Sequence, residues 1–314
     1  MLNAGSDHSD LEVALPADLR RFGNSTMVRV AGEVGAPAVV ALGGISASRF
    51  VCRGEDGGAG WWPGLVGARC AVDPERHRVL GLDFAADPSG RCAPTTEDQA
   101  RVLAAALDCA GIDRVHAIVG ASYGGMVALA FAASFPARVS RLAIISAGAE
   151  PHPAASAARE LQRRIVALGL RSGHADEALA IARGMAMLTY RTPEEFDARF
   201  RGGLDSEDPL APSEAGRYLR ARGAAFRAVM SPERFLSLSG SIDRHRIGAG
   251  AIACPALLVG ATSDQLVPPA QMRVLAQLLG GETRLHLLDC LEGHDMFLTQ
   301  ASAVGDLIKP FLEA

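Results

Sequence analysis

The chain has 314 residues, 49% of them hydrophobic, so it is long enough to bury a large core. Its 31 Lys and Arg residues are nearly balanced by 35 Asp and Glu, and a formal net charge of -4 argues against a nucleic-acid partner. The six cysteines have neither a C-x-x-C pair nor the spacing with histidine that a zinc site needs, so we expect free thiols and no metal at Cys52, Cys70, Cys92, Cys109, Cys254 and Cys290.

The beginning of the chain carries no targeting signal of a familiar kind. Its first ten residues are polar and acidic, without the basic start and apolar stretch of a signal peptide. No apolar run elsewhere reaches the length of a membrane span. The sequence therefore predicts a cytoplasmic protein with no membrane partner.

Short aliphatic runs alternate with longer helical patterns, which is typical of βαβ units. Such units predict an α/β fold with a mostly parallel central sheet and helices on both faces. In the first run, Arg29 stands between Val28 and Val30, an alternation that indicates an antiparallel edge strand. The predicted strands cover residues 27–30, 38–42, 79–82, 115–119, 142–145, 256–259 and 284–288.

Two helices are predicted beside the middle strands. Residues 96–99, Thr-Glu-Asp-Gln, match a capping box, and apolar residues then recur at helical spacing until Gly111. Residues 126–135 are apolar almost all round and end before Pro136, which predicts a helix packed beneath other elements.

The pattern changes between residues 149 and 248. Strand-like runs disappear there, and the segment is rich in Arg, Ala and Glu at helical spacing. Pro209 and Pro232 mark helix boundaries within it. We interpret residues 149–248 as an inserted helical cap over a core domain made of residues 1–148 and 249–314.

The strongest local motif is Gly-Ala-Ser-Tyr-Gly-Gly at residues 120–125, between a predicted strand and a predicted helix. Glycines on both sides of Ser122 permit a tight turn that lifts the hydroxyl above the sheet, as in the α/β-hydrolase fold. A simple glycine turn is the alternative interpretation. The strand before the motif and the helix after it favour Ser122 as a nucleophile.

A serine hydroxyl needs a base to take its proton, and this fold places an acid and then a histidine later in the chain. Asp264 follows the predicted strand at 256–259, and His294 lies in the loop after the strand at 284–288. The other histidines lie inside strands or outside this order. Asp83 and Asp289 also follow strands, but Asp83 precedes the serine and Asp289 is close to the histidine loop.

An oxyanion needs backbone N–H donors, one after the nucleophile and one from an early loop. The amide of Tyr123 is the first candidate. The glycine-rich loop at residues 42–47 offers the second, from Gly44 or Ile45, although an ordinary strand-to-loop turn would look the same.

Several stretches together resemble the homoserine O-acyltransferase family, whose members have the α/β-hydrolase fold. They are residues 60–67, 120–126, 187–200 and 293–297, and the Thr-Tyr-Arg and His-Asp pieces are the most particular to the family. The resemblance implies transfer of an acyl group from acyl-CoA to the hydroxyl of L-homoserine in methionine biosynthesis, by a ping-pong mechanism. It implies that Arg191 binds the carboxylate of homoserine and Asp295 its ammonium group.

The same resemblance bears on the acyl donor and on assembly. Residues 43–47 and 121–123 are more similar to the succinyl-using branch than to the acetyl-using one. A succinyl donor carries a second carboxylate, and the hypothesis from sequence position is that Arg49 or Arg53 binds it. CoA would be a substrate, so no cofactor is expected, and the resemblance implies a homodimer through the cap.

Three alternatives stay open from the sequence alone. The first is a homoserine or serine O-acetyltransferase. The second is a carboxylesterase that uses the same triad with water as the acceptor. The third is a non-catalytic binding protein with a hydrolase-like fold.

Overall fold

The computed structural model describes residues 8–52, 54, 57–204 and 206–314. Within them, eight strands form one sheet in the order β1-β2-β4-β3-β5-β6-β7-β8. The pairs from β4 to β8 are parallel, whereas β1–β2 and β2–β4 are antiparallel. The strands are β1 His8–Ala14, β2 Ser25–Ala31, β3 Ala38–Leu42, β4 Arg78–Leu82, β5 Ala117–Ala121, β6 Leu142–Ile145, β7 Ala256–Ala261 and β8 Thr283–Leu288.

The prediction of an edge strand at 27–30 is half right. Those residues lie in β2, which is antiparallel to its neighbours, but β1 covers its outer side and forms the edge of the sheet. The prediction missed β1 because this strand is mostly exposed: only Val13 in it is buried.

Alternate residues of the central strands face two separate hydrophobic cores. Val40 and Leu42 of β3 pack into one core with helices α1, α2 and α8, whereas Val39 and Ala41 pack into the other core with α10. Both faces of the sheet are therefore covered, as a parallel sheet requires. The core helices are α1 Thr96–Cys109, α2 Tyr123–Ser134, α8 Pro269–Leu278, α9 Met296–Thr299 and α10 Ala301–Glu313.

The capping box of α1 lies one residue before the predicted one. Thr95 is the N-cap and Asp98 is its reciprocal partner, so the box is not 96–99. Thr96 is buried, and its hydroxyl contacts Nδ1 of His245 at 2.8 Å. The side chain of Gln99 bonds instead to the backbone of Ala85.

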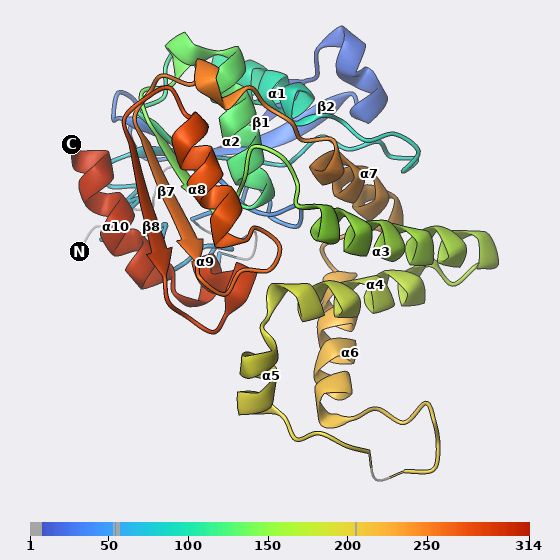
Figure 1. Ribbon diagram of the computed structural model, residues 1–314. Helices are drawn as coiled ribbons and strands as arrows, with labels where there is room; N and C mark the ends of the chain where they lie inside the picture. The colour runs from blue at the N-terminus through green and yellow to red at the C-terminus, as the bar shows by residue number, and fades with distance from the viewer. Residues whose placement is uncertain (1–7, 53, 55–56, 205) are drawn as a thin grey trace, which may run out of the picture.

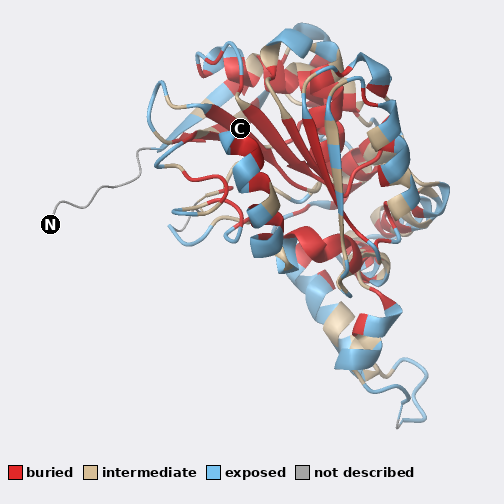
Figure 2. Cartoon of the chain, turned by 60° about the vertical axis from the view of Figure 1, so that its left-hand side comes forward, coloured by how far each residue is buried: buried red, intermediate tan, exposed pale blue. Residues whose placement is uncertain are grey.

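Five helices are inserted between β6 and β7: α3 Pro153–Ser172, α4 Ala175–Tyr190, α5 Pro193–Arg199, α6 Glu214–Phe226 and α7 Pro232–Asp243. Figure 1 shows α3, α4 and α7 next to the core, with α5 and α6 extending away from it. Buried residues concentrate in the sheet and the helices against it, whereas the far end of the insertion is largely exposed (Figure 2). We call this insertion the cap.

Candidate active site

Ser122 lies at the turn between β5 and α2 with a positive φ of 53°. Two glycines make this turn possible. A Cβ on Gly120 would lie 2.5 Å from the carbonyl oxygen of Gly124, and a Cβ on Gly124 would lie 2.4 Å from the backbone of Leu42. The N–H of Ser122 donates a hydrogen bond of 2.8 Å to the carbonyl of Ile145 in β6, which ties the turn to the sheet. The backbone thus imposes the strained conformation that presents the hydroxyl.

The structure brings together the three residues predicted as a triad. The Oγ of Ser122 lies 2.8 Å from Nε2 of His294, and Nδ1 of His294 lies 2.8 Å from Oδ2 of Asp264. A carboxylate can only accept, so Nδ1 carries the proton and Nε2 is free to take one from Ser122. The other oxygen of Asp264 accepts bonds from the amides of Leu266 and Val267, at 2.9 and 3.0 Å.

Opposing effects of burial and of neighbouring charges determine the pKa of His294. Its burial, with 6% of the residue exposed, disfavours the charged imidazolium. The charge and hydrogen bond of Asp264 outweigh this, and the charge of Asp295 adds to them, while Arg159 acts in the opposite direction. The net effect is a pKa raised above the ordinary value for histidine. The imidazolium that forms during catalysis is therefore stabilised in place.

The predicted oxyanion donors lie beside the nucleophile. Tyr123 begins α2, so its amide has no helical acceptor. The carbonyl of Gly43 accepts from the amide of Gly124, at 2.8 Å, and ties the loop after β3 to the nucleophile turn. Gly44 and Ile45 follow and line the cavity that contains Ser122. Within the part of the chain that the structure describes, their amides donate no hydrogen bond.

The cavity above Ser122 has two lobes that meet at four shared residues: Ser122, Tyr190, Ile242 and His294. The small lobe has a volume of about 40 Å³ and runs under α3 of the cap. The large lobe, about 170 Å³, lies between the Gly44–Ile45 loop and an aromatic wall of the cap and core. Core and cap therefore both enclose the nucleophile.

Arg159 of α3 lines the small lobe, and the sequence prediction missed it. Its Nε and Nη2 bond to Oδ1 of Asp243 at 2.9 and 2.6 Å. Arg163, which does not line the lobe, takes the other oxygen of the same carboxylate at 2.6 Å. Two guanidinium groups thus share one carboxylate, and Arg159 places one of them in the lobe that contains Ser122.

Arg191 and Asp295 lie in contact with each other. Nε of Arg191 is 2.9 Å from Oδ2 of Asp295, and Nη1 is 2.8 Å from Oε1 of Glu195. Asp295 lines the large lobe, and Arg191 contacts it from behind. The two predicted substrate-binding residues are therefore joined, rather than standing at opposite ends of an open site.

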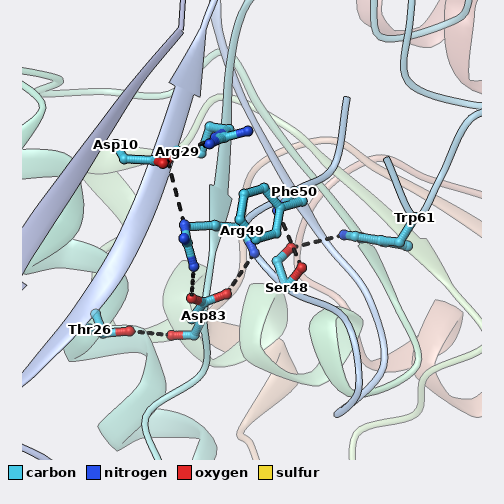
Figure 3. Close-up of polar contacts among 8 residues, drawn as sticks. All are labelled: Asp10, Thr26, Arg29, Ser48, Arg49, Phe50, Trp61 and Asp83. Carbon is cyan, nitrogen blue, oxygen red and sulfur yellow. Dashed lines mark hydrogen bonds and ion pairs between the residues drawn. The ribbon is translucent and has the colours of Figure 1, made fainter. Parts of the chain in front are cut away.

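The structure does not bring Arg49 into either lobe. Its Nη1 is 2.7 Å from Oδ2 of Asp83, its Nε is 3.5 Å from Asp10, and its guanidinium stacks over Phe50 (Figure 3). It lines a different cavity, at the edge of the sheet near β1 and β2. Nearness in sequence to the oxyanion loop misled the prediction, because the side chain turns to these carboxylates instead. Arg53 lies outside the described residues.

The described residues contain neither a cluster of metal-ligating side chains nor a membrane-spanning helix. No three His, Cys, Asp or Glu side chains lie close enough to hold a metal ion together. No helix in the same residues combines the length and apolarity needed to cross a membrane. All six cysteines are free.

Comparisons with known proteins agree with this geometry. A family model described as the alpha/beta hydrolase fold matches residues 37–301. The chain is 41% identical over 283 residues to a homoserine O-succinyltransferase of Xanthomonas campestris pv. campestris, covering 90% of the chain and 77% of that protein. It is 33% identical over 287 residues to a homoserine O-acetyltransferase of Thermus thermophilus, covering 82% and 73%.

Among solved structures, that of the esterase E22 L374D mutant superposes with a TM-score of 0.84 at 20% identity, covering 99% of this chain and 100% of that one. This likeness shows the fold alone. The sequence matches go further, and together they show that the chain belongs to the homoserine O-acyltransferase family within the α/β-hydrolase superfamily.

Proposed function

We propose that the enzyme transfers a succinyl group from succinyl-CoA to the hydroxyl of L-homoserine through an acyl-enzyme on Ser122. The observation that carries the choice of succinyl is Arg159, a cation in the small lobe beside Ser122 and His294. The resemblance to the Xanthomonas succinyltransferase supports the same choice.

The donor carboxylate explains the arrangement around Asp243. One carboxylate neutralises only one of the two guanidinium groups that bind it, Arg159 and Arg163. Nη1 of Arg159 has no hydrogen-bond partner among the described residues, so it is available to a ligand. A carboxylate on a short acyl chain would accept a charge-assisted hydrogen bond from this Nη1, whereas an acetyl group would leave the Nη1 without a partner.

The first half-reaction follows from the triad. His294 removes the proton of Ser122 as the hydroxyl attacks the thioester carbonyl, while Asp264 holds the imidazole in the required tautomer. The amides of Tyr123 and of Gly44 or Ile45 stabilise the oxyanion. His294 then returns this proton to the departing sulfur, so CoA leaves as a thiol and the acyl group remains on Ser122 as an ester.

The second half-reaction uses the large lobe. Oδ2 of Asp295 is occupied by Arg191, and Oδ1 has no partner among the described residues, so Oδ1 can accept the ammonium group of homoserine. Arg191, next to it, would bind the carboxylate. His294 then takes the proton of the homoserine hydroxyl, which attacks the ester and frees Ser122.

The nearest rival is a carboxylesterase, because the triad would serve both reactions. The discriminating experiment is release of CoA thiol from succinyl-CoA, measured with and without homoserine. We expect homoserine to accelerate steady-state thiol release strongly and O-succinylhomoserine to accumulate with it. Equal release in both reactions, with free succinate as the product, would favour the hydrolase.

Substituting Arg159 tests the acyl donor. We expect Arg159→Leu to lower kcat/KM for succinyl-CoA by roughly 10- to 100-fold, as for a lost charge-assisted bond, and to leave acetyl-CoA nearly unchanged. Arg163→Leu is the matched control, since it also breaks a bond to Asp243 but removes no charge from the lobe. An Arg159→Leu enzyme that kept its full preference for succinyl-CoA would show that Arg159 does not select the acyl donor.

We also propose that the protein associates with a second copy through the cap. Leu161 and Leu168 on α3, and Ile181 and Leu188 on α4, recur two helical turns apart and are each about half exposed. The two helices pack against each other, so these side chains can form one apolar surface. Light scattering should give a dimer for the wild type and a monomer for Leu161→Glu/Leu168→Glu; a wild-type monomer would contradict the proposal.

A further inference from the structure

Part of the cap is docked directly on the loop that carries His294. The hydroxyl of Thr192 donates to the carbonyl of Leu291 at 2.6 Å. Gly293 has a φ of 59°, and a Cβ there would lie 2.6 Å from the carbonyl oxygen of Tyr190. The segment around α5 is therefore in close contact with the histidine loop, so it belongs to the site as well as to the cap.

A chain of alternating charges runs from this segment into the site. Nη1 of Arg199 and Nη1 of Arg191 both bond to Oε1 of Glu195, each at 2.8 Å. Nε of Arg191 in turn bonds to Oδ2 of Asp295 at 2.9 Å. Glu195 thus lies behind Arg191, and it lines neither lobe of the cavity.

Glu195 is an unusual residue to place in this position. It is only 8% exposed, and its Oε2 is buried without a hydrogen-bond partner in the described residues. An unsatisfied buried carboxylate oxygen is costly. Its other oxygen accepts from two guanidinium groups, so the benefit of the residue must come through the arginines it holds.

The consequence for Arg191 is a fixed orientation. A guanidinium group beside a single carboxylate favours a two-bond fork, which would occupy both oxygens of that carboxylate. In this protein the guanidinium is pinned at two corners by different carboxylates, at Nε by Asp295 and at Nη1 by Glu195. In this orientation neither Oδ1 of Asp295 nor Nη2 of Arg191 has a hydrogen-bond partner among the described residues, so both are available to a ligand.

We infer that Glu195 is a positioning residue for the acyl acceptor: it holds Arg191 so that Asp295 keeps one oxygen open to the large lobe. This inference rests on the proposed function, in which Arg191 and Asp295 bind the amino acid. It assigns Glu195 to the second half-reaction and to no step of the first.

The test separates the two half-reactions in three variants. Glu195→Ala should raise KM for homoserine about tenfold, the effect of one charge-assisted bond, while the burst of thiol release from succinyl-CoA without acceptor stays within about twofold. Glu195→Gln keeps an oxygen for Nη1 and should restore most of the lost affinity. Glu194→Gln, at the exposed neighbouring position, is the matched control and should behave as the wild type.

Two results would overturn the role of Glu195 alone: an unchanged KM for homoserine in Glu195→Ala, or an equal loss in both half-reactions, which would indicate general damage to the fold. A failure of the proposed function is distinguishable from these. In that case the wild-type enzyme itself would release thiol without acylating homoserine, and the role of Glu195 toward an amino acid would fall with it.

Discussion

The core and the cap hold their functional groups in different ways. The core fixes Ser122 and Asp264 through backbone bonds, from Ser122 N–H to Ile145 and to Asp264 from two amides. The cap holds Arg159 and Arg191 through side-chain ion pairs on helices. Backbone hydrogen bonds next to the sheet therefore fix the triad, whereas side-chain ion pairs hold the residues that we propose to select the donor and the acceptor.

The largest effect is expected in the core, from Asp264→Asn. The amide cannot stabilise the imidazolium and favours the wrong tautomer of His294, so kcat should fall by about 10⁴-fold with either acyl donor. Asp289→Asn is the control, because Thr262 is the hydrogen-bond partner of the Asp289 carboxylate among the described residues and this contact is exposed. Steady-state kinetics would contradict the assignment if Asp289→Asn were the more damaging change.

The next largest loss of activity is expected from Gly124→Ala, which tests whether close backbone packing holds Ser122 in its turn conformation. The added Cβ meets the backbone of Leu42, which cannot yield as a flexible side chain would. We expect about 2 kcal/mol or more of lost stability and at least a 100-fold loss of kcat. Gly202→Ala, in open space on the cap, should change neither thermal unfolding nor activity. Wild-type behaviour of Gly124→Ala would contradict the prediction.

The difference between the core and the cap also explains which parts of the site the sequence could predict. The triad was found because its residues follow strands in a fixed order and because glycines mark the turn at Ser122. The resemblance to known acyltransferases indicates Arg191 and Asp295 as substrate-binding residues, which stays a prediction, and does not indicate their mutual contact. Arg159 went unnoticed because α3 contains many arginines, and only the packing of α3 over the core decides which one faces the nucleophile.

The misplaced predictions have equally local causes. Arg49 follows the oxyanion loop in the chain, yet Asp83 and Asp10 hold it at the edge of the sheet. The strand β1 has a mostly exposed pattern that does not distinguish it from a polar tail. Long-range charge pairing and strand pairing at an edge are set by tertiary structure, which short sequence windows do not contain.

A smaller effect should come from Asp295→Asn, where the cap and the histidine loop meet. The charge of Asp295 helps to raise the pKa of His294, and catalysis needs the neutral imidazole. Without that charge the pKa falls, so the acidic limb of kcat/KM for the donor should move to lower pH. KM for homoserine should also rise about tenfold. A limb that stayed in place or moved to higher pH would show that Asp295 does not act on His294.

The smallest effect is expected where the cap touches the oxyanion hole. The hydroxyl of Tyr123 lies 2.6 Å from Oγ of Ser241 on α7, and both residues are buried. Ser241→Ala leaves the phenol without this partner and should cost about 1 kcal/mol of stability and a few-fold in kcat. Adding Tyr123→Phe removes the second polar group and should recover most of the loss. A double variant worse than either single one would contradict this interpretation.

The most direct test of the account is the partition of the acyl-enzyme between homoserine and water. Enzyme acylated with succinyl-CoA, freed of excess donor and mixed with homoserine, can be quenched at intervals and analysed for succinyl-Ser122, O-succinylhomoserine and succinate. We expect the ester on Ser122 to persist without acceptor and to pass to homoserine at least as fast as the enzyme turns over. Rapid loss to succinate at a rate that homoserine does not change would contradict it.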